Sequence, residues 1–530
     1  MTRPLALHPL LFFLAIVLFF CAHNPGRLSL QENWQPMVWL LMPMLVIEAM
    51  VLRMRRARMV AVLFSLFVVL FFSYGQVFDV LQDLQWNGWR VRHSVLMLTW
   101  AALFTWGTRA ALRAKSDLAN LTRVLNFVSL ILIAVPVAQI AAHSIGGGVL
   151  WSWSRPAPPL VVQAGEPATQ TNPDIYYIIL DRYANEETLR ASYGLDNTEF
   201  LQFLREKGFL VASESYSNYP KTALSLASSL NLGYIDDLSS DPGRESSDWV
   251  PVHSRLRDYR VWRFLKSRGY TFIHFGTRWE PTRINPNADV NVNVFTPPEM
   301  IWALAGQTVL HPIGSELGIG LFDQRVLEWE RIPYQLEKLP GIARDPRPTF
   351  AFVHLLIPHG PYVFERDGSF LPEETATQRS RRENYRNQLL YANRKVREAI
   401  GRLLADSPTP PVIILQGDEG PIPIGYPREG LKFHWEAATD AELREKAGIL
   451  NAYYLPGVKS EKVYPSISPV NSFRLIFNEY FHTKLPMLRD EHYFPKDDHH
   501  PYDFFDATQR LKKRPQQTLM SRSPAQARPE

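Results

Sequence analysis

The segment Ile175-Tyr176-Tyr177-Ile178-Ile179-Leu180-Asp181 is a short apolar run that ends in an acid. A continuous apolar run of this length is typical of a strand that is buried on both faces, as strands of parallel sheets are. Asp181 would then lie at the carboxyl end of the strand, where open α/β sheets bind their ligands. The segment therefore predicts a parallel sheet and also predicts which edge of that sheet carries a site.

A second stretch, Ser217-Asn218-Tyr219-Pro220-Lys221-Thr222, leads into small and apolar residues at helical spacing as far as Leu230. Pro220 favours an extended residue before it, so we expect the helix to begin at Thr222. Backbone N–H groups and the helix dipole at such a start favour an anion. A hydroxyl there, near a carboxylate that could hold a metal, is a way to attack a phosphate. Lys221 could steer the anion, and a solvated lysine is an equal alternative.

A third stretch, Val412 to Gly420, is another strand pattern that ends in Gly-Asp-Glu-Gly. Hard divalent cations prefer carboxylate oxygens, and a metal both lowers the pKa of a nucleophile and neutralises a phosphoryl oxygen. Taken singly, each acid can be a strand-end acid, a helix cap or part of a turn. In this order, Asp181, Thr222, Asp418 and Glu419 predict a site that binds one or two divalent metal ions, with manganese, magnesium, calcium and zinc all left open.

The chain before residue 146 is dominated by apolar segments of about the length that crosses a bilayer. They cover residues 9–23, 36–52, 59–78, 93–107 and 124–143. The first could be a signal peptide, but it has a single early arginine and lacks a small-residue cleavage site, so we expect a retained anchor. These features predict five transmembrane spans.

Arginines and lysines between the apolar segments indicate the orientation of the chain. They concentrate in the second connection, around Arg53 to Arg58, and in the fourth, around Arg109 to Arg123. The positive-inside rule places both connections in the cytoplasm, which puts the N-terminus inside and everything after residue 145 outside. The net charge of +5 is therefore typical of membrane topology and not of nucleic-acid binding. The single cysteine, Cys21, excludes a disulfide framework or a cysteine metal site within one chain.

The predicted domain organisation has four parts: a five-span transmembrane domain over residues 1–145, a linker over 146–173, an extracytoplasmic α/β domain over 174–505 and a disordered basic tail over 506–530. Strand patterns in the third part alternate with helical ones, which favours a mostly parallel sheet. The expected strands are 175–180, 271–275, 350–356, 411–416 and 449–454. The expected helices are 197–207, 222–230, 255–268, 378–405 and 439–447.

The order of these motifs resembles a known family. A strand with Asp181, a loop and helix with Thr222, the loop His359-Gly360-Pro361-Tyr362 and a strand with Gly-Asp-x-Gly resemble the alkaline phosphatase/sulfatase superfamily. More closely, the chain is similar to the membrane-anchored sulfatase-like branch that includes lipoteichoic acid synthases and phosphoglycerol and phosphoethanolamine transferases. Those proteins also place membrane spans before an extracytoplasmic α/β domain. The similarity covers about residues 173–485.

The resemblance assigns roles to individual residues. It implies that Asp181 and Asp418 are metal ligands and that Thr222 is both nucleophile and ligand. It implies that His359 contacts the substrate head group or the leaving oxygen. The chain departs from the family at Glu419, where a histidine is usual; glutamate also binds hard cations. His354, on the strand before His359, is either a core residue or part of the substrate site.

The resemblance also implies a reaction class. Sulfatases modify a Cys or Ser in Cys/Ser-x-Pro-x-Arg, and the equivalent stretch here begins with an unmodified Thr222, which disfavours sulfatase activity and suits phosphoryl transfer. The implied function is transfer of a phospho-alcohol head group from a membrane phospholipid to a surface or periplasmic glycan, through a phosphothreonine-type intermediate, at the cytoplasmic (inner) membrane. The alternative is a non-catalytic sulfatase-like membrane protein that binds a glycan or a protein partner, and the Asp-Glu-Gly departure is the feature that favours it.

Overall fold

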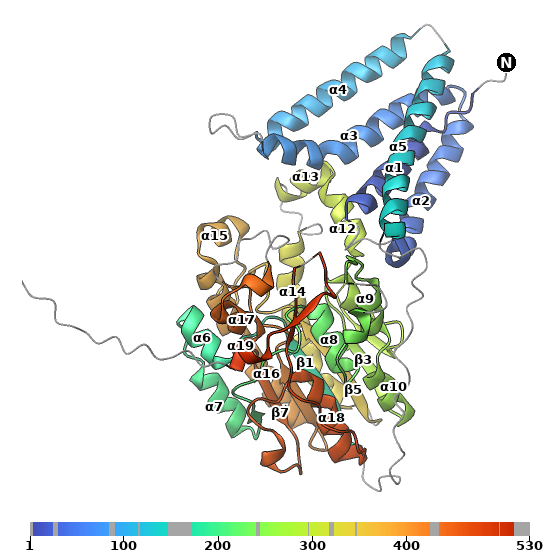
Figure 1. Cartoon of the computed structure of the whole chain (residues 1–530). Coiled ribbons are helices and arrows are strands. Elements are labelled where there is room, and N and C mark those ends of the chain that lie inside the picture. The colour runs from blue at the N-terminus through green and yellow to red at the C-terminus, as the bar shows by residue number, and fades with distance from the viewer. Residues whose placement is uncertain are drawn as a thin grey trace, which may run out of the picture.

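The computed structural model describes residues 4–24, 30–83, 91–114, 117–146, 172–239, 244–294, 296–316, 323–344, 347–423, 434–497 and 499–512. N-terminal helices form one group, and an α/β domain follows them (Figure 1). The predicted linker, residues 146–173, lies almost entirely outside the described residues.

The N-terminal helices match the five apolar segments. They are α1 (His8–His23), α2 (Leu30–Leu52), α3 (Ala57–Asp83), α4 (His93–Arg113) and α5 (Ala119–Gly146). Helices α2 to α5 each contain a stretch long and apolar enough, by length and composition, to cross a membrane. Helix α1 has 16 residues, which is about 24 Å at 1.5 Å per residue and falls short of a hydrocarbon core of about 30 Å. Four candidate spans are therefore established, and the fifth remains a prediction.

The α/β domain is built on a seven-stranded sheet in the order β2-β7-β6-β1-β5-β3-β4. The strands are β1 (Ile175–Leu180), β2 (Leu210–Val211), β3 (Thr271–Phe275), β4 (Val290–Val292), β5 (Thr349–Leu355), β6 (Val412–Gln416) and β7 (Asn451–Tyr454). All neighbouring pairs from β6 to β4 are parallel, and β7 pairs antiparallel with both β6 and β2. The prediction of a mostly parallel central sheet is confirmed, and all five expected strands are present.

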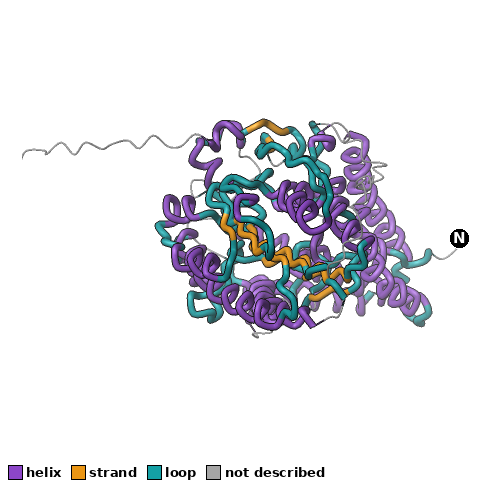
Figure 2. Tube along the Cα trace, turned by 90° about the horizontal axis from the view of Figure 1, so that it is seen from below, coloured by secondary structure: helices purple, strands orange, loops and turns teal. Residues whose placement is uncertain are grey.

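Helices cover both faces of the sheet, which crosses the middle of the domain in Figure 2. The side chains of strand β1 are apolar on both faces of the sheet. Tyr176, Ile178 and Leu180 pack on one face, and the residues between them pack on the other. The first face is covered by α6 (Glu186–Tyr193), α7 (Thr198–Glu206), α14 (Gln324–Lys338) and α16 (Arg381–Asp406). The second is covered by α8 (Thr222–Leu230), α9 (Val250–Arg257), α10 (Arg260–Ser267) and α18 (Pro469–Phe481). The domain is thus a three-layer α/β/α fold.

One expected helix is interrupted in the structure, and another begins later than expected. The region 255–268 is split between α9 and α10 because Asp258 and Tyr259 are extended, and the Tyr259 ring is buried in the core. The expected helix 378–405 is α16, which begins at Arg381 after the short helix α15 (Glu373–Gln378); the Ser380 side chain accepts a hydrogen bond from the backbone of the third residue of α16. A side-chain cap of this kind starts a new helix. The three remaining helices of the set, α7, α8 and α17 (Asp440–Ala447), agree with the expectation.

The prediction of a disordered tail from residue 506 is wrong for its first residues. Strand β9 (Phe504–Asp506) pairs with β8 (Tyr493–Pro495), and α19 (Thr508–Lys512) follows. Ala507 and Leu511 are buried in an apolar cluster with residues that include Trp435 and Leu443. Burial of these two side chains orders the segment although its neighbours are polar and basic. Residues 513–530 lie outside the described residues.

Two further helices of the α/β domain lie between its sheet and the N-terminal helices: α12 (Glu299–Gly306) and α13 (Leu310–Glu316) (Figure 1). Met300 and Leu304 of α12 share one apolar cluster with residues of α1, α2 and α3. The backbone N–H of Gly75 in α3 donates a hydrogen bond of 2.9 Å to the carbonyl of Gln307. A Cβ at Gly75 would lie 2.7 Å from Gln307 Cα, so only glycine permits this approach.

Candidate active site and metal centre

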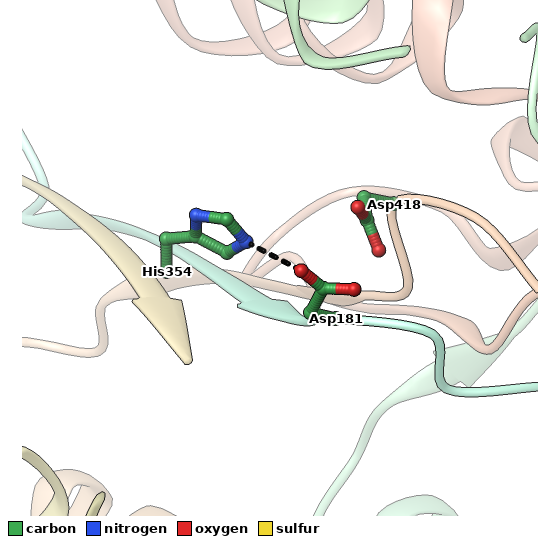
Figure 3. Close-up of side chains that lie close together, drawn as sticks. All are labelled: Asp181, His354 and Asp418. Carbon is green, nitrogen blue, oxygen red and sulfur yellow. Dashed lines mark ion pairs between the residues drawn. The ribbon is translucent and has the colours of Figure 1, made fainter. Parts of the chain in front are cut away.

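Three neighbouring strands deliver the central residues of the site. Strands β6, β1 and β5 are adjacent and parallel, and their carboxyl ends carry Asp418, Asp181 and His354 respectively. One ligand atom of each residue lies within 4.8 Å of one ligand atom of the other two. Figure 3 shows the His354 ring directed at the Asp181 carboxylate, with Asp418 on the other side of Asp181. The convergence of Asp181 and Asp418 follows from the parallel topology.

Close backbone approach brings the first and last motifs together. A Cβ at Gly417 would lie 2.5 Å from the carbonyl oxygen of Tyr183, so the end of β6 can approach the turn after β1 only with glycine at this position. In that turn, Arg182 has a left-handed backbone with φ of 63°, and its N–H donates a hydrogen bond of 3.0 Å to Asp418 Oδ1. Contacts between the two segments that carry the acids therefore place Asp181 and Asp418 beside each other.

The chemistry of the three central residues fits a divalent cation. All three side chains are buried. Within the described part of the chain, Asp181 Oδ1, Asp418 Oδ2 and His354 Nε2 are buried without a hydrogen-bond partner. Buried polar atoms without partners are costly and call for an unseen ligand or ion. Two carboxylates and one imidazole are ligands that manganese and zinc both accept.

The orientation of the His354 ring supports the same interpretation. Its Nδ1 lies 3.0 Å from Thr282 Oγ1 in α11 (Glu280–Arg283). When Nδ1 carries the proton, Nε2 presents its lone pair 3.4 Å from Asp181 Oδ2. A lone pair facing a carboxylate is unfavourable unless a proton or a cation lies between them. A hydrogen bond to the distal ring nitrogen is also how proteins orient metal-binding histidines.

The two carboxyls have opposite pKa shifts. Burial is the main reason that the pKa of Asp418 lies well above its ordinary value, and the negative charges of Asp181 and Glu419 act in the same direction. Burial would also raise the pKa of Asp181, but His359, His354 and Arg182 together hold it below its ordinary value. Without a cation, a proton held by the pair would therefore lie on Asp418 in preference to Asp181. Because a bound divalent cation stabilises both ionised carboxylates, it would displace that proton.

Thr222 is the first residue of α8, as the sequence predicts. Its side chain interacts with the Asp418 carboxyl and opposes the rise in the pKa of that group. The Ser225 hydroxyl, one turn further along α8, donates a hydrogen bond of 2.7 Å to the Asp418 carbonyl and fixes the helix against the loop. Lys221 precedes Thr222 in an extended conformation. The predicted nucleophile therefore contacts the predicted metal ligand Asp418.

Glu419 has different partners from those of Asp418. Its Oε1 accepts a hydrogen bond of 2.9 Å from Arg182 Nε and lies 2.8 Å from Lys446 Nζ. The three residues that group as a candidate metal site do not include Glu419. Burial lowers the pKa of Lys446 to about 8, although the Glu419 carboxylate opposes this shift. Glu419 as a metal ligand remains a prediction, and its observed partners are two cations.

His359 lies in the loop after β5 and is half-buried. Its Nδ1 contacts the Gly360 carbonyl, and its own carbonyl accepts a hydrogen bond of 2.7 Å from Gln388. Burial lowers the pKa of His359 to about 4, and the nearby Arg182 guanidinium acts in the same direction. His359 is therefore a neutral imidazole near pH 7. Its predicted contact with a substrate stays a prediction.

Sequence reasoning missed three cations of the site: Arg182, Arg278 and Lys446. Arg278 donates a hydrogen bond of 3.3 Å to the Gly360 carbonyl beside His359. Arg182 had a signal, since it directly follows the strand-end acid. Lys446 had none, because it occupies an ordinary position near the end of an amphipathic helix.

The fold and the site together define a membrane-attached α/β protein with a buried carboxylate–imidazole cation site beside a hydroxyl at a helix start. No protein-family model matches the chain, and no curated protein matches it. Solved structures do resemble it. The C-terminal periplasmic domain of EptC from Escherichia coli has a TM-score of 0.42 and 14% identity, over 66% of this chain and 96% of that one.

Two other solved structures extend the comparison. The integral membrane protein lipooligosaccharide phosphoethanolamine transferase A (EptA) from Neisseria meningitidis has a TM-score of 0.39 and 13% identity, over 91% of this chain and 95% of that one. The lipoteichoic acid synthase LtaP from Listeria monocytogenes has a TM-score of 0.39 and 15% identity, over 65% and 84%.

Proposed function

We propose that this protein is a membrane-anchored, metal-dependent transferase or hydrolase of phosphate esters. The observation that carries the proposal is the set of three buried ligand atoms on Asp181, His354 and Asp418 that have no partner in the described part of the chain, with the Thr222 side chain beside Asp418. Asp181, His354 and Asp418 would hold the cation. Bound there, a divalent cation would favour the ionised nucleophile and neutralise a phosphoryl oxygen.

The reaction we propose has two halves. In the first, Thr222 Oγ forms a bond to the phosphorus of a phospholipid phosphodiester, and the bond from phosphorus to the lipid oxygen breaks. The proton lost by Thr222 ends on the departing alkoxide, so the lipid leaves as a neutral alcohol. The phospho-alcohol head group stays on Thr222 as a phosphodiester.

In the second half, an acceptor hydroxyl attacks the same phosphorus and the bond from phosphorus to Thr222 Oγ breaks. The acceptor proton is transferred to Thr222, which regains its hydroxyl. With a sugar hydroxyl of a surface or periplasmic glycan the outcome is transfer, and with water it is hydrolysis. His359 would contact the head group or the leaving oxygen from the loop after β5.

The position of the domain supports a membrane lipid as the donor. Gln307, the residue after α12, contacts α3 at Gly75, toward the end of α3 that is remote from the arginine-rich connection Arg53 to Arg58. With that connection in the cytoplasm, the α/β domain lies on the outer side, on the periplasmic face of the inner membrane. Attachment to the same bilayer raises the effective concentration of a lipid donor at the site.

The test is phosphodiester cleavage by the purified full-length protein, with magnesium, manganese, calcium or zinc supplied in turn. Thr222→Ala should reduce turnover by at least about 10³-fold while the protein still folds and binds metal, since losing one helix-start hydroxyl costs about 1 kcal/mol. Thr222→Ser should keep measurable activity because a primary hydroxyl can make the same attack. Mass spectrometry should find the phospho-adduct on Thr222 in the parent protein.

Full activity in Thr222→Ala would overturn the mechanism. A parent protein that is inactive with all four metals, and that forms no adduct, would instead favour the non-catalytic alternative, a membrane protein that binds a glycan or a protein partner.

A further inference from the structure

We propose that Arg182 is a substrate-contacting residue whose guanidinium binds a non-bridging oxygen of the phosphate attacked by Thr222, and that Glu419 is the positioning residue that holds it there. The inference deepens the proposed function and rests on it. It also assigns a role to the glutamate of the Asp-Glu-Gly sequence, because a carboxylate at position 419 can form an ion pair with a guanidinium.

The contacts of the Arg182 side chain leave part of its guanidinium available. Its Nε donates to Glu419 Oε1, and the side chain is 23% exposed whereas that of Glu419 is 2% exposed. Among the described residues, the terminal nitrogens Nη1 and Nη2 make no hydrogen bond to protein. One edge of the planar group is thus fixed by a buried acid, and the terminal donors remain for a ligand. Phosphate oxygens match the fork geometry of such donors.

The neighbours of Arg182 place its charge inside the site. Arg182 directly follows Asp181, and its Nε donates to Glu419, which directly follows Asp418. Its backbone N–H donates to the Asp418 carboxylate, and Ser225 of the helix that Thr222 begins donates to the Asp418 carbonyl. The guanidinium therefore belongs to the same small volume as the nucleophile and the candidate metal ligands.

The backbone of Arg182 is held in a conformation that arginine rarely adopts. A left-handed φ costs a residue other than glycine roughly 1–2 kcal/mol. The conformation is fixed from both sides: the N–H donates to Asp418, and the carbonyl accepts a hydrogen bond of 2.8 Å from the Tyr385 hydroxyl. Strain of this kind persists where the surroundings over-determine it, and it clusters at functional sites.

Lys446 completes the arrangement. Two cations, Arg182 and Lys446, share the single carboxylate of Glu419, which leaves one positive charge in excess. Gly420 makes this possible, since a Cβ there would lie 2.2 Å from the Glu445 carbonyl and 2.8 Å from that of Lys446. A buried carboxylate with two cationic partners has a net charge that favours an anion. A histidine at position 419 could not pair with both cations.

The experiment uses the full-length protein in detergent with manganese, and inorganic phosphate as the binding probe. Arg182→Gln should weaken phosphate binding by about 10–100-fold, the loss expected for a charged hydrogen bond. It should lower kcat/KM for bis(4-nitrophenyl) phosphate while manganese affinity stays within about threefold. Free guanidinium should restore part of the activity of Arg182→Ala, which a purely structural role would not allow. Arg379→Gln, which removes a half-buried arginine paired with Glu365, is the matched control and should behave as the parent.

Glu419 variants separate its two candidate roles. If Glu419 positions Arg182, Glu419→His and Glu419→Gln should weaken phosphate binding and leave manganese binding nearly unchanged. Loss of manganese binding with retained phosphate binding would make Glu419 a metal ligand and overturn its positioning role. Unchanged phosphate affinity and kcat/KM in Arg182→Gln would overturn the inference as a whole. A parent without phosphodiesterase activity whose phosphate binding still depends on Arg182 would overturn the transfer reaction alone.

Discussion

The backbone N–H of Arg182 and the carboxylate of Asp418 are joined by a hydrogen bond of 3.0 Å across 236 positions of the chain. The bond links the turn after the central strand β1 to the loop after its neighbour β6. Because the donor is a backbone N–H group, the hydrogen bond is retained after any side-chain substitution at position 182 that keeps the left-handed turn. The candidate metal ligand Asp418 can therefore be studied separately from the Arg182 side chain.

Asp418→Asn should separate metal binding from folding. In the parent, manganese at about 100 times its Kd should add about 2.7 kcal/mol of stability, and the variant should lose most of this gain. In chelator, the variant should be about as stable as the parent, because burial and the Asp181 charge already favour the neutral form of Asp418, which the asparagine amide replaces. Thermal unfolding with and without manganese measures both effects. Asp237→Asn changes an exposed acid outside the site and should keep the stabilisation by manganese. If Asp418→Asn is stabilised by manganese as much as the parent, Asp418 is not a metal ligand.

Gly420→Ala should be destabilising and should impair the site. The added Cβ would meet the Glu445 carbonyl at 2.2 Å, and overpacking of this kind costs about 1–3 kcal/mol. Phosphodiesterase activity should fall with it, since Glu419 and Lys446 flank the contact. Gly401→Ala is the matched control: Gly401 lies within α16 with open space around it, so the substitution should stabilise the protein by up to about 1 kcal/mol. Equal effects of the two substitutions would contradict the close approach at Gly420.

His492 should make the stability of the protein depend on pH. Burial lowers its pKa to about 4 from 6.5, and its Nδ1 lies 2.9 Å from the Ser217 carbonyl in the loop that leads to Thr222. Between these two pH values the unfolded state binds the proton and the folded state does not. The contribution is therefore complete above pH 6.5 and is lost as the pH falls toward 4, by about 3 kcal/mol in total.

The measurement is thermal unfolding of the parent and of His492→Gln at pH 7.5, 6 and 5. The variant should be less stable at pH 7.5 because it loses a fitted side chain, and its melting temperature should fall less on acidification. His499→Gln, at an exposed position, should follow the parent at all three pH values. Parallel curves for the parent and His492→Gln would show that His492 titrates normally.

Reporter fusions should resolve the number of spans. With five spans, a reporter that is active only outside the cytoplasm should work at the C-terminus and fail at the N-terminus. With the four spans α2 to α5 alone and the same outer domain, it should work at both ends. Activity of a strictly cytoplasmic reporter at the C-terminus would overturn the predicted orientation and, with it, the lipid donor.

Much of the architecture was predictable because strong local patterns agreed with the fold. The apolar run before Asp181 forms the central strand. Asp181 and Asp418 were both expected at strand ends, and the structure has them close together. Thr222 begins its helix where Pro220 and the apolar spacing indicated. Parallel strands align their carboxyl ends, so residues far apart in sequence meet without any further information.

The features that the sequence did not predict depend on tertiary contacts. His354 was left between a core role and a substrate role, because its position on a strand does not show that Nε2 lacks a partner. Lys446 meets Glu419 only through the close approach at Gly420. The ordered segment as far as Lys512 depends on two buried side chains, Ala507 and Leu511, in an otherwise polar stretch. In each case the deciding partner is remote in sequence.

The contact between Gly75 and Gln307 is part of a second connection between the N-terminal helices and the α/β domain. The covalent connection is the chain from residue 147 to 171. The non-covalent connection consists of the Gly75–Gln307 hydrogen bond and the burial of Met300 and Leu304 among the N-terminal helices. A segment from the middle of the α/β domain thus completes the packing of helices that precede it in the chain. A polypeptide cut between residues 147 and 171 should therefore remain a single particle, held together by this non-covalent connection.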